Sequence, residues 1–189
     1  MRIGIDIDDT ICDTWKTLVP YLSKFFNVDK KFLKESDKPY DGMWNDNYDE
    51  YCRFAKKYYR VLAPKYKLKK NARKIINKLK SEGNEIIFIT ARSENGFEDP
   101  YKISYDYLSR HKIKFDKLIV CAKDKGKICK EENIDIFIDD SLHNCQSISN
   151  YSIDVLLFDE KWNRNCNHYK RVYNWPDVYK AIKGVKNDG

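Results

Sequence analysis

Short apolar runs alternate with helical patterns along most of this chain, and this alternation constrains the fold more than any other feature. The apolar runs occupy residues 1–7, 85–90, 118–120, 134–138 and 154–158. Runs this short and this apolar are typical of strands that are buried on both faces. Strands that alternate with helices form βαβ units, whose helices cover a parallel sheet on either side. We therefore expect an α/β fold with a Rossmann-like three-layer core and a parallel sheet.

One long stretch interrupts the alternation directly after the first strand. It contains two helical patterns, separated by a polar and broken segment at 27–46, and these patterns cover residues 15–26 and 48–62. Pro20 lies inside the first pattern, so we expect either a kink or a late start of that helix. We expect residues 14–67 to form a small helical cap inserted after the first strand, and residues 1–13 and 68–189 to form the α/β core.

Composition excludes several classes of protein. The chain is 42% hydrophobic and 14% aromatic, which argues against a disordered protein. No apolar run approaches the roughly 18 residues of a membrane span, so we expect no membrane partner. The N-terminus MRIGIDIDDT has acids where a secretory signal has an apolar segment. None of the six cysteines forms a C-x-x-C pair, and we expect reduced thiols in a cytoplasmic protein.

The formal net charge is +7, from 36 basic and 29 acidic residues. Basic proteins favour anionic partners such as phosphates, nucleic acids or membrane surfaces. The lysines are scattered, however, and we interpret the densest run, Lys65–Lys70, as a solvated surface before a helix. Because the chain has no basic stripe and no known nucleic-acid motif, we expect no nucleic-acid partner. The sequence leaves the oligomeric state open.

Acidic and hydroxyl side chains follow three of the apolar runs. Asp6, Asp8 and Asp9 end the first run, Thr90 ends the second, and Asp139–Asp140 follow the run at 134–138. Each of these positions alone is also typical of a turn or a helix cap. Parallel strands bring their carboxyl ends to one edge of the sheet, so we expect these groups to converge there. Converging carboxylates repel one another unless a cation neutralises them, and oxygen ligands of this kind suit Mg²⁺.

The same residues resemble the motifs of haloacid dehalogenase-like phosphatases over about residues 1–13 and 68–160. Asp6-Ile7-Asp8-Asp9-Thr10 resembles their D-x-D-x-T motif, Thr90 their second motif, Lys125 their third, and Asp139–Asp140 their acidic pair. The cap position and the stretch from Lys125 to Asp140 are similar, more narrowly, to the 5′(3′)-deoxyribonucleotidase group. Bacterial nucleotidase-like members of that group carry a stretch in the first helix that is similar to Pro20-Tyr21-Leu22.

This resemblance implies a Mg²⁺-dependent phosphomonoesterase that forms an aspartyl-phosphate. Asp6 would be the nucleophile. Asp8 would act as general acid and then general base, for which we expect a raised pKa supplied by neighbouring carboxylates. Thr90 would donate a hydrogen bond to a phosphoryl oxygen, and Lys125 would neutralise the transferring group. Lys127 is the alternative to Lys125.

The resemblance also implies a set of metal ligands. Asp6 and Asp140 would hold Mg²⁺ through their side chains and Asp8 through its carbonyl oxygen, with Asp139 lying behind the ligands. The motif usually has glycine where this chain has Asp9. Aspartate tolerates the left-handed backbone conformation better than most residues, so the substitution is compatible with activity.

Substrate choice is expected to belong to the cap. Trp15, Tyr40 and Trp44 are candidates for stacking on a nucleobase, and core packing is the alternative for aromatic residues of cap helices. Arg92 is a candidate for binding a phosphate, with a surface arginine as the alternative. A nucleoside monophosphate is the expected substrate. Another small phosphorylated metabolite, such as a sugar phosphate, and a non-catalytic binding protein on the same fold are the alternative functions.

Overall fold

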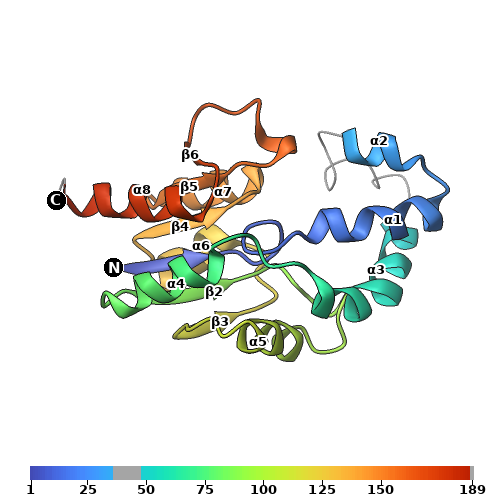
Figure 1. The fold of residues 1–189 in the computed structure, drawn as a ribbon, viewed down its shortest axis with the longest axis horizontal. Coiled ribbons are helices and arrows are strands. Elements are labelled where there is room, and N and C mark those ends of the chain that lie inside the picture. Colours follow the sequence, from blue (N-terminus) through green and yellow to red (C-terminus); the bar gives the residue numbers. More distant parts are fainter. Residues whose placement is uncertain (36–47, 188–189) are drawn as a thin grey trace.

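The computed structural model describes residues 1–35 and 48–187, and every structural statement below concerns these residues. Six parallel strands form one sheet in the order β3-β2-β1-β4-β5-β6 (Figure 1). The strands are β1 (Arg2–Ile5), β2 (Glu85–Ile89), β3 (Lys117–Ile119), β4 (Ile136–Asp139), β5 (Asp154–Phe158) and β6 (Lys170–Val172). The expected α/β fold with a parallel sheet is therefore confirmed.

Helices cover both faces of the sheet, so the core has three layers. One face carries α4 (Ala72–Ser81), α5 (Pro100–Arg110) and α8 (Trp175–Asn187), and the other carries α6 (Lys125–Glu131) and α7 (Leu142–Ser149). Ile76, Leu108 and Ile182 from the first three helices share one hydrophobic core. Cys129 of α6 and Cys145 of α7 belong to a second core on the opposite face.

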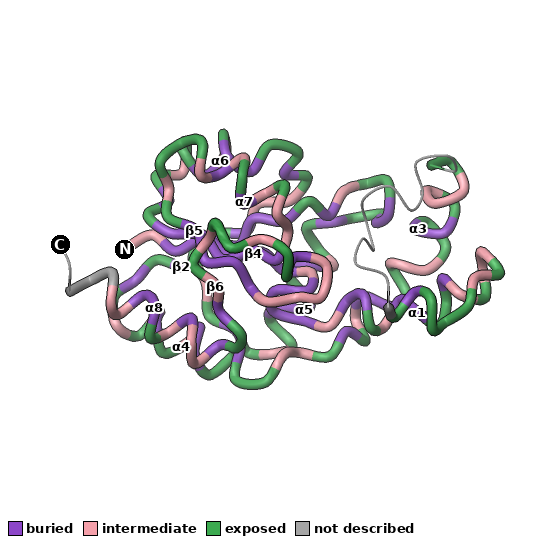
Figure 2. The backbone as a smooth tube through the Cα atoms, turned by 90° about the horizontal axis from the view of Figure 1, so that it is seen from above, coloured by how far each residue is buried: buried purple, intermediate pink, exposed green. Residues whose placement is uncertain are grey.

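Consecutive strand residues pack into opposite cores. In β4, Ile136 and Ile138 belong to the first core, whereas Phe137 between them belongs to the second. Successive side chains of a strand point to opposite faces, so a strand covered on both sides is apolar throughout. This is why the sequence shows continuous apolar runs, and why the strands are buried at the centre of the molecule (Figure 2).

Three further helices lie beyond the carboxyl ends of the strands, at the right of Figure 1. They are α1 (Thr14–Phe26), α2 (Lys30–Glu35) and α3 (Tyr48–Leu62), and a short 3₁₀ helix, η2 (Ala63–Lys65), follows them. The chain leaves the core and returns to it side by side, because Asp13 N–H donates to Lys67 O (2.9 Å) and Lys69 N–H donates to Ile11 O (2.8 Å). These paired segments connect the three helices to the sheet.

Several elements differ from the expected ones. β6 was not expected, since only three residues, Lys170–Val172, form this edge strand and two of them are charged. α2 falls in the segment at 27–46 that was expected to be broken. α1 begins at Thr14 and continues through Pro20, so the late start was wrong.

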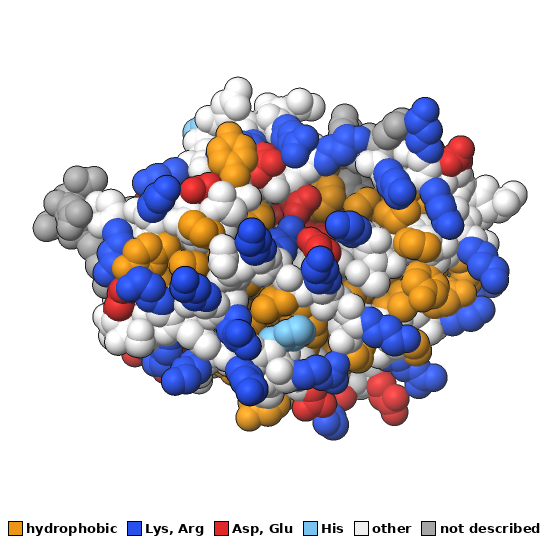
Figure 3. Space-filling view, viewed as in Figure 1, with side chains coloured by type: hydrophobic (Ala, Val, Ile, Leu, Met, Phe, Trp, Pro, Cys, Tyr) orange, Lys and Arg blue, Asp and Glu red, His pale blue; other side chains and the backbone are white. Residues whose placement is uncertain are grey.

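Basic side chains are scattered over the surface (Figure 3), as they are along the sequence. Lys and Arg side chains spread widely over the face shown in Figure 3, with Asp and Glu side chains among them. Among the described helices, none combines the length and the apolar character needed to cross a membrane.

Candidate active site

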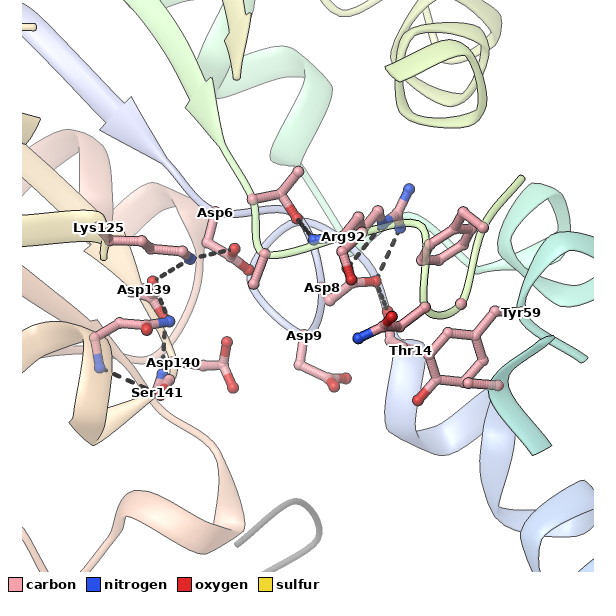
Figure 4. Close-up of a pocket in the computed structure, with 18 of the residues that line it drawn as sticks. Asp6, Asp8, Asp9, Thr14, Tyr59, Arg92, Lys125, Asp139, Asp140 and Ser141 are labelled. Carbon is pink, nitrogen blue, oxygen red and sulfur yellow. Dashed lines mark hydrogen bonds and ion pairs between the residues drawn. The ribbon is translucent and has the colours of Figure 1, made fainter. Parts of the chain in front are cut away.

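A cavity of about 350 Å³ lies where the carboxyl ends of β1, β2 and β4 face α3 (Figure 4). The sheet side of the cavity is lined by the strand-end residues Asp6, Thr90 and Asp139, together with Lys125. The opposite side is lined by residues of α3 and by the loop after β2. The parallel topology thus gathers groups from distant segments at one edge of the sheet, such as Asp6 and Lys125, which are 119 positions apart in the chain.

Lys125 joins two of the strand-end carboxylates. Its Nζ lies 2.5 Å from Asp6 Oδ1 and 2.7 Å from Asp139 Oδ2, and only 1% of its side chain is exposed. Burial opposes the charge of this lysine, but Asp139 and Asp6 outweigh burial and raise the pKa of Lys125. The ammonium group is therefore a permanent cation at the floor of the cavity.

Local structure explains why Lys125 occupies this position. Lys125 opens α6, whose N-terminus is capped by the side chain of Asp124. Gly126 allows α6 to approach α7 closely, since a Cβ atom there would lie 2.2 Å from Ser147 O. Lys127, the alternative suggested by the sequence, is 66% exposed and points toward Glu131. The structure therefore brings Lys125, and not Lys127, into the cavity.

Asp6, Asp139 and Asp140 form a compact acidic group. One oxygen of each lies within 4.8 Å of the others. Burial, followed by the neighbouring Asp139 and Asp8, raises the pKa of Asp6 to about 7 despite Lys125. Burial and then Asp139 raise the pKa of Asp140 well above its usual value. Three carboxylates face one ammonium group here, and this uncompensated set of oxygen donors fits a hard divalent cation such as Mg²⁺.

The two acids of the pair at the end of β4 differ in their surroundings. Asp139 accepts hydrogen bonds at both oxygens from Lys125, Ser141 N–H and Asn144 Nδ2. Asp140 accepts one hydrogen bond at each oxygen, from Thr10 Oγ1 (3.1 Å) and from Trp162 Nε1 (3.0 Å). A carboxylate has about four acceptor positions, so Asp140 keeps free positions on both oxygens.

Asp8 has a different environment from the one expected. Arg92 Nε and Nη2 lie 2.8 Å from the two oxygens of Asp8, and Thr14 Oγ1 donates to Asp8 Oδ1 at 2.6 Å. Burial favours the neutral acid, but the Arg92 guanidinium and these hydrogen bonds outweigh it and lower the pKa of Asp8. The expectation of a raised pKa was wrong, because the nearest charged partner is a cation rather than another carboxylate.

Arg92 is a buried residue, so the surface alternative was wrong. Only 1% of its side chain is exposed. Its Nη1 donates to Ser104 Oγ at 3.3 Å, and its guanidinium lies 5.5 Å from the centre of the Phe97 ring and 5.8 Å from that of Tyr66. These contacts direct the guanidinium toward Asp8 at the rim of the cavity (Figure 4).

Asp9 adopts the left-handed backbone conformation that its motif position requires, with φ of 54°. Both of its carboxylate oxygens accept the backbone N–H of Trp15, at 3.0 and 3.2 Å. The Asp9 carboxylate is thus directed at the first turn of α1, where a negative charge is favourable.

The substrate-binding candidates are distributed differently. Trp15 packs in the hydrophobic core with 7% of its surface exposed and does not line the cavity. Tyr40 and Trp44 lie outside the described residues. Thr90 lines the cavity, and its Oγ1 accepts the backbone N–H of Arg92.

An aromatic wall that the sequence analysis did not single out faces the acidic group. It comprises Tyr48, Tyr51 and Tyr59 of α3 together with Tyr66 and Phe97. The hydroxyl groups of Tyr51 and Tyr59 are hydrogen-bonded to each other. Tyrosines at 48, 51 and 59 lie on one face of a helix, so helical spacing contained the signal.

A comparison with a solved structure identifies the fold. A haloacid dehalogenase-like family hydrolase of Streptococcus pneumoniae has a TM-score of 0.68 to this structure at 13% identity, covering 96% of this chain and 97% of that chain. The parallel sheet covered by helices on both faces therefore has the fold of haloacid dehalogenase-like hydrolases.

Sequence comparisons give the family. The model for 5′ nucleotidase, deoxy (pyrimidine), cytosolic type C proteins matches residues 1–187. A nucleotidase of Clostridium acetobutylicum is 31% identical over 185 residues, which are 96% of this chain and 93% of that protein. A 5′(3′)-deoxyribonucleotidase of Bacillus subtilis is 27% identical over 188 residues, which are 95% of this chain and 97% of that protein. The chain belongs to this cytosolic type C 5′-nucleotidase family and is a hydrolase of phosphoric monoesters.

Proposed function

We propose that this protein is a Mg²⁺-dependent nucleotidase of the cytoplasm that hydrolyses nucleoside or deoxynucleoside monophosphates through an aspartyl-phosphate on Asp6. The main support is that the acidic group around Lys125 and the aromatic wall line the same cavity. The acidic group can hold a metal-bound phosphate, and the aromatic wall can hold a base. The relatives named nucleotidase and 5′(3′)-deoxyribonucleotidase and the cytosolic family description point the same way.

Asp6 is the proposed nucleophile. Lys125 engages its Oδ1, and among the described residues no hydrogen bond reaches its Oδ2. In the first step, Asp6 Oδ2 bonds to phosphorus, the ester P–O bond breaks, and the leaving oxygen takes a proton from Asp8. In the second step, water attacks the phosphorus, Asp8 accepts its proton, and inorganic phosphate leaves with Asp6 restored.

Asp8 is ionised in the geometry described above, which suits its role as the base of the second step. To act as acid in the first step it must take up a proton. A phosphate monoester loses its second proton near pH 6, so the monoanion of the substrate can bring that proton into the cavity. The fork of Arg92 and the Thr14 hydroxyl fix the direction of the Asp8 carboxylate.

Residues Asp6 and Asp140 would hold Mg²⁺ through their side chains, and Asp8 through its carbonyl oxygen. A bound Mg²⁺ would supply charge neutralisation and orientation of the phosphoryl group. Thr90 and Lys125 supply a hydroxyl and an ammonium group for the phosphoryl oxygens on the sheet side of the cavity. Asp139 holds Lys125 and lies behind the ligands, as its saturated hydrogen bonds suggest.

We propose further that residues 14–67 act as a cap that selects the substrate. Tyr51 and Tyr59 of α3 line the side of the cavity opposite the acidic group, where their aromatic rings and hydroxyl groups would contact a base. Stacking on aromatic rings is available to every base, so hydrogen bonds must provide any finer choice.

Phosphate release from a panel of monoesters tests this function. The panel contains nucleoside 5′- and 3′-monophosphates, sugar phosphates and an aryl phosphate, each assayed with Mg²⁺ and with a chelator. The proposal expects the highest kcat/KM for a nucleotide and no turnover without metal. Higher kcat/KM for a sugar phosphate would overturn the nucleotide assignment, and turnover in the presence of chelator would overturn the metal assignment.

A further inference from the structure

A pair of residues in the segment that follows β5 contacts the proposed metal ligand Asp140, and none of the sequence motifs includes this pair. They belong to the short 3₁₀ helix η3 (Lys161–Asn163). The indole Nε1 of Trp162 donates to Asp140 Oδ2 at 3.0 Å, while Thr10 Oγ1 donates to Asp140 Oδ1 at 3.1 Å from the loop after β1. The Asp140 carboxylate is therefore held from two sides, by one donor on each oxygen.

Asn163 holds the backbone of the same residue. Its Nδ2 donates to Asp140 O and to Phe158 O, both at 2.8 Å, so it joins the ends of β4 and β5. Its Oδ1 accepts Arg171 Nη1 at 2.6 Å and Glu160 N–H at 3.3 Å. A fully buried amide with all its polar atoms engaged has one orientation only.

The donors to Asp140 are neutral, and this distinguishes it from its neighbour. Asp139 is paired with the Lys125 ammonium group, whereas the donors to Asp140 within the described part of the chain are a hydroxyl and an indole N–H. Neutral donors fix the direction of a carboxylate without cancelling its charge. No cation among the described residues is hydrogen-bonded to Asp140, which therefore has a free acceptor position on each oxygen for a metal ion.

We propose that Trp162 and Asn163 are positioning residues that hold Asp140 in its metal-binding orientation. The inference rests on the proposed Mg²⁺-dependent function. Trp162 fixes the side chain through Oδ2, and Asn163 fixes the backbone that carries it. Loss of such a supporting partner costs about 10- to 100-fold in metal affinity.

Trp162→Phe tests the side-chain contact, because it removes the indole N–H and keeps an aromatic ring. Mg²⁺ binding to the purified full chain is measured by isothermal titration calorimetry, with no substrate present. The inference expects binding about 10-fold weaker or more than in the wild type. At saturating Mg²⁺, KM for the phosphate ester should stay near the wild-type value, because Trp162 does not line the substrate cavity.

Trp175→Phe is the matched control. Trp175 is fully buried in the core, and its Nε1 has no hydrogen-bond partner among the described residues. Its substitution lowers the free energy of unfolding through lost packing, and Mg²⁺ affinity should remain that of the wild type. An equal loss of Mg²⁺ affinity in both variants would overturn the inference, since general loosening would then explain the result.

Thr10→Val supplies a second variant on the other oxygen of Asp140. Valine has nearly the shape of threonine and cannot donate, so it also should weaken Mg²⁺ binding. Unchanged affinity in both Trp162→Phe and Thr10→Val, with normal binding by the wild type, would overturn the positioning role alone. Absence of Mg²⁺ binding by the wild type would instead overturn the metal assignment of the proposed function, and this inference with it.

Discussion

Arg92 donates two hydrogen bonds of 2.8 Å to Asp8, one to each carboxylate oxygen. The two residues are 84 positions apart in the chain, at the ends of neighbouring strands. A bidentate pair of this kind fixes the plane of the carboxylate as well as its position. Asp8, the proposed acid-base residue, is thereby held in one orientation at the cavity before any substrate binds.

Arg92→Lys should impair turnover although it keeps the charge. Lysine is a point charge and cannot reproduce the planar fork, so Asp8 loses its fixed direction. General acid-base catalysis is worth about 10²- to 10⁴-fold, and we expect kcat to fall by about 10²-fold. Steady-state kinetics measure this, and a kcat equal to that of the wild type would contradict the assigned role.

Arg92→Ala should in addition destabilise the fold. It leaves Asp8 without its cation, a loss of about 2–3 kcal/mol once the 30% exposure of the Asp8 side chain is taken into account. Urea unfolding measures this loss, and Arg92→Lys should lose less because its charge remains.

Tyr51→Ala should weaken nucleotides far more than a bare aryl phosphate. Loss of one base stack costs about 1–3 kcal/mol, or roughly 5- to 150-fold in kcat/KM. Both substrates are assayed on one preparation, so partial misfolding affects them equally. Tyr101→Ala, which removes an exposed tyrosine of α5, is the control. An equal fall in kcat/KM for both substrates would identify Tyr51 as a packing residue. Stacking of a base on Trp44, which lies outside the described residues, stays a separate prediction.

The pH dependence of stability should report on Asp6. Burial raises the pKa of Asp6 from 3.8 to about 7 in the folded protein without metal. Between these pH values the folded state binds more protons than the unfolded state, so the free energy of unfolding falls as pH rises. The amide introduced by Asp6→Asn cannot titrate. In the presence of chelator, the stability of the wild type relative to Asp6→Asn should therefore decline from pH 4 to pH 7, and a constant difference would contradict the burial of Asp6.

Asp9→Gly and Asp9→Ala should separate backbone conformation from charge. Both variants remove the carboxylate that accepts the Trp15 N–H. Only glycine adopts a φ of 54° without steric cost, so Asp9→Ala should be less stable than Asp9→Gly by about 1 kcal/mol. Urea unfolding of the two variants checks this, and equal stabilities would refute the strain argument.

The sheet and the acidic edge were predictable because local patterns specify both. Apolar runs such as 134–138 identify strands buried on two faces, and parallel strands can meet at only one carboxyl edge. Asp6, Thr90 and Asp140 could therefore be placed together without a structure. Lys125 came from the resemblance to the family's third motif, with Lys127 as the alternative, and the structure shows that α6 begins at Lys125.

The rest depended on contacts between distant segments. Nothing near Arg92 in the sequence identifies Asp8 as its partner. For that reason the pKa of Asp8 was expected to be raised, whereas the structure lowers it. Trp162 lies 22 residues from Asp140 and follows a loop that the apolar pattern does not specify. β6 was missed because a three-residue edge strand with two charged residues has no apolar run to reveal it.

The central claim is that phosphate passes through the Asp6 carboxylate, and trapping that species tests it most directly. The protein is mixed with a nucleoside monophosphate and Mg²⁺, quenched within one turnover, and treated with borohydride, which reduces an acyl-phosphate to an alcohol. Peptide mass spectrometry then identifies the side chain at position 6. We predict homoserine at that position, absent when Mg²⁺ is chelated and absent in Asp6→Asn. Turnover with an unmodified Asp6, or with the modification on another carboxylate, would contradict the account.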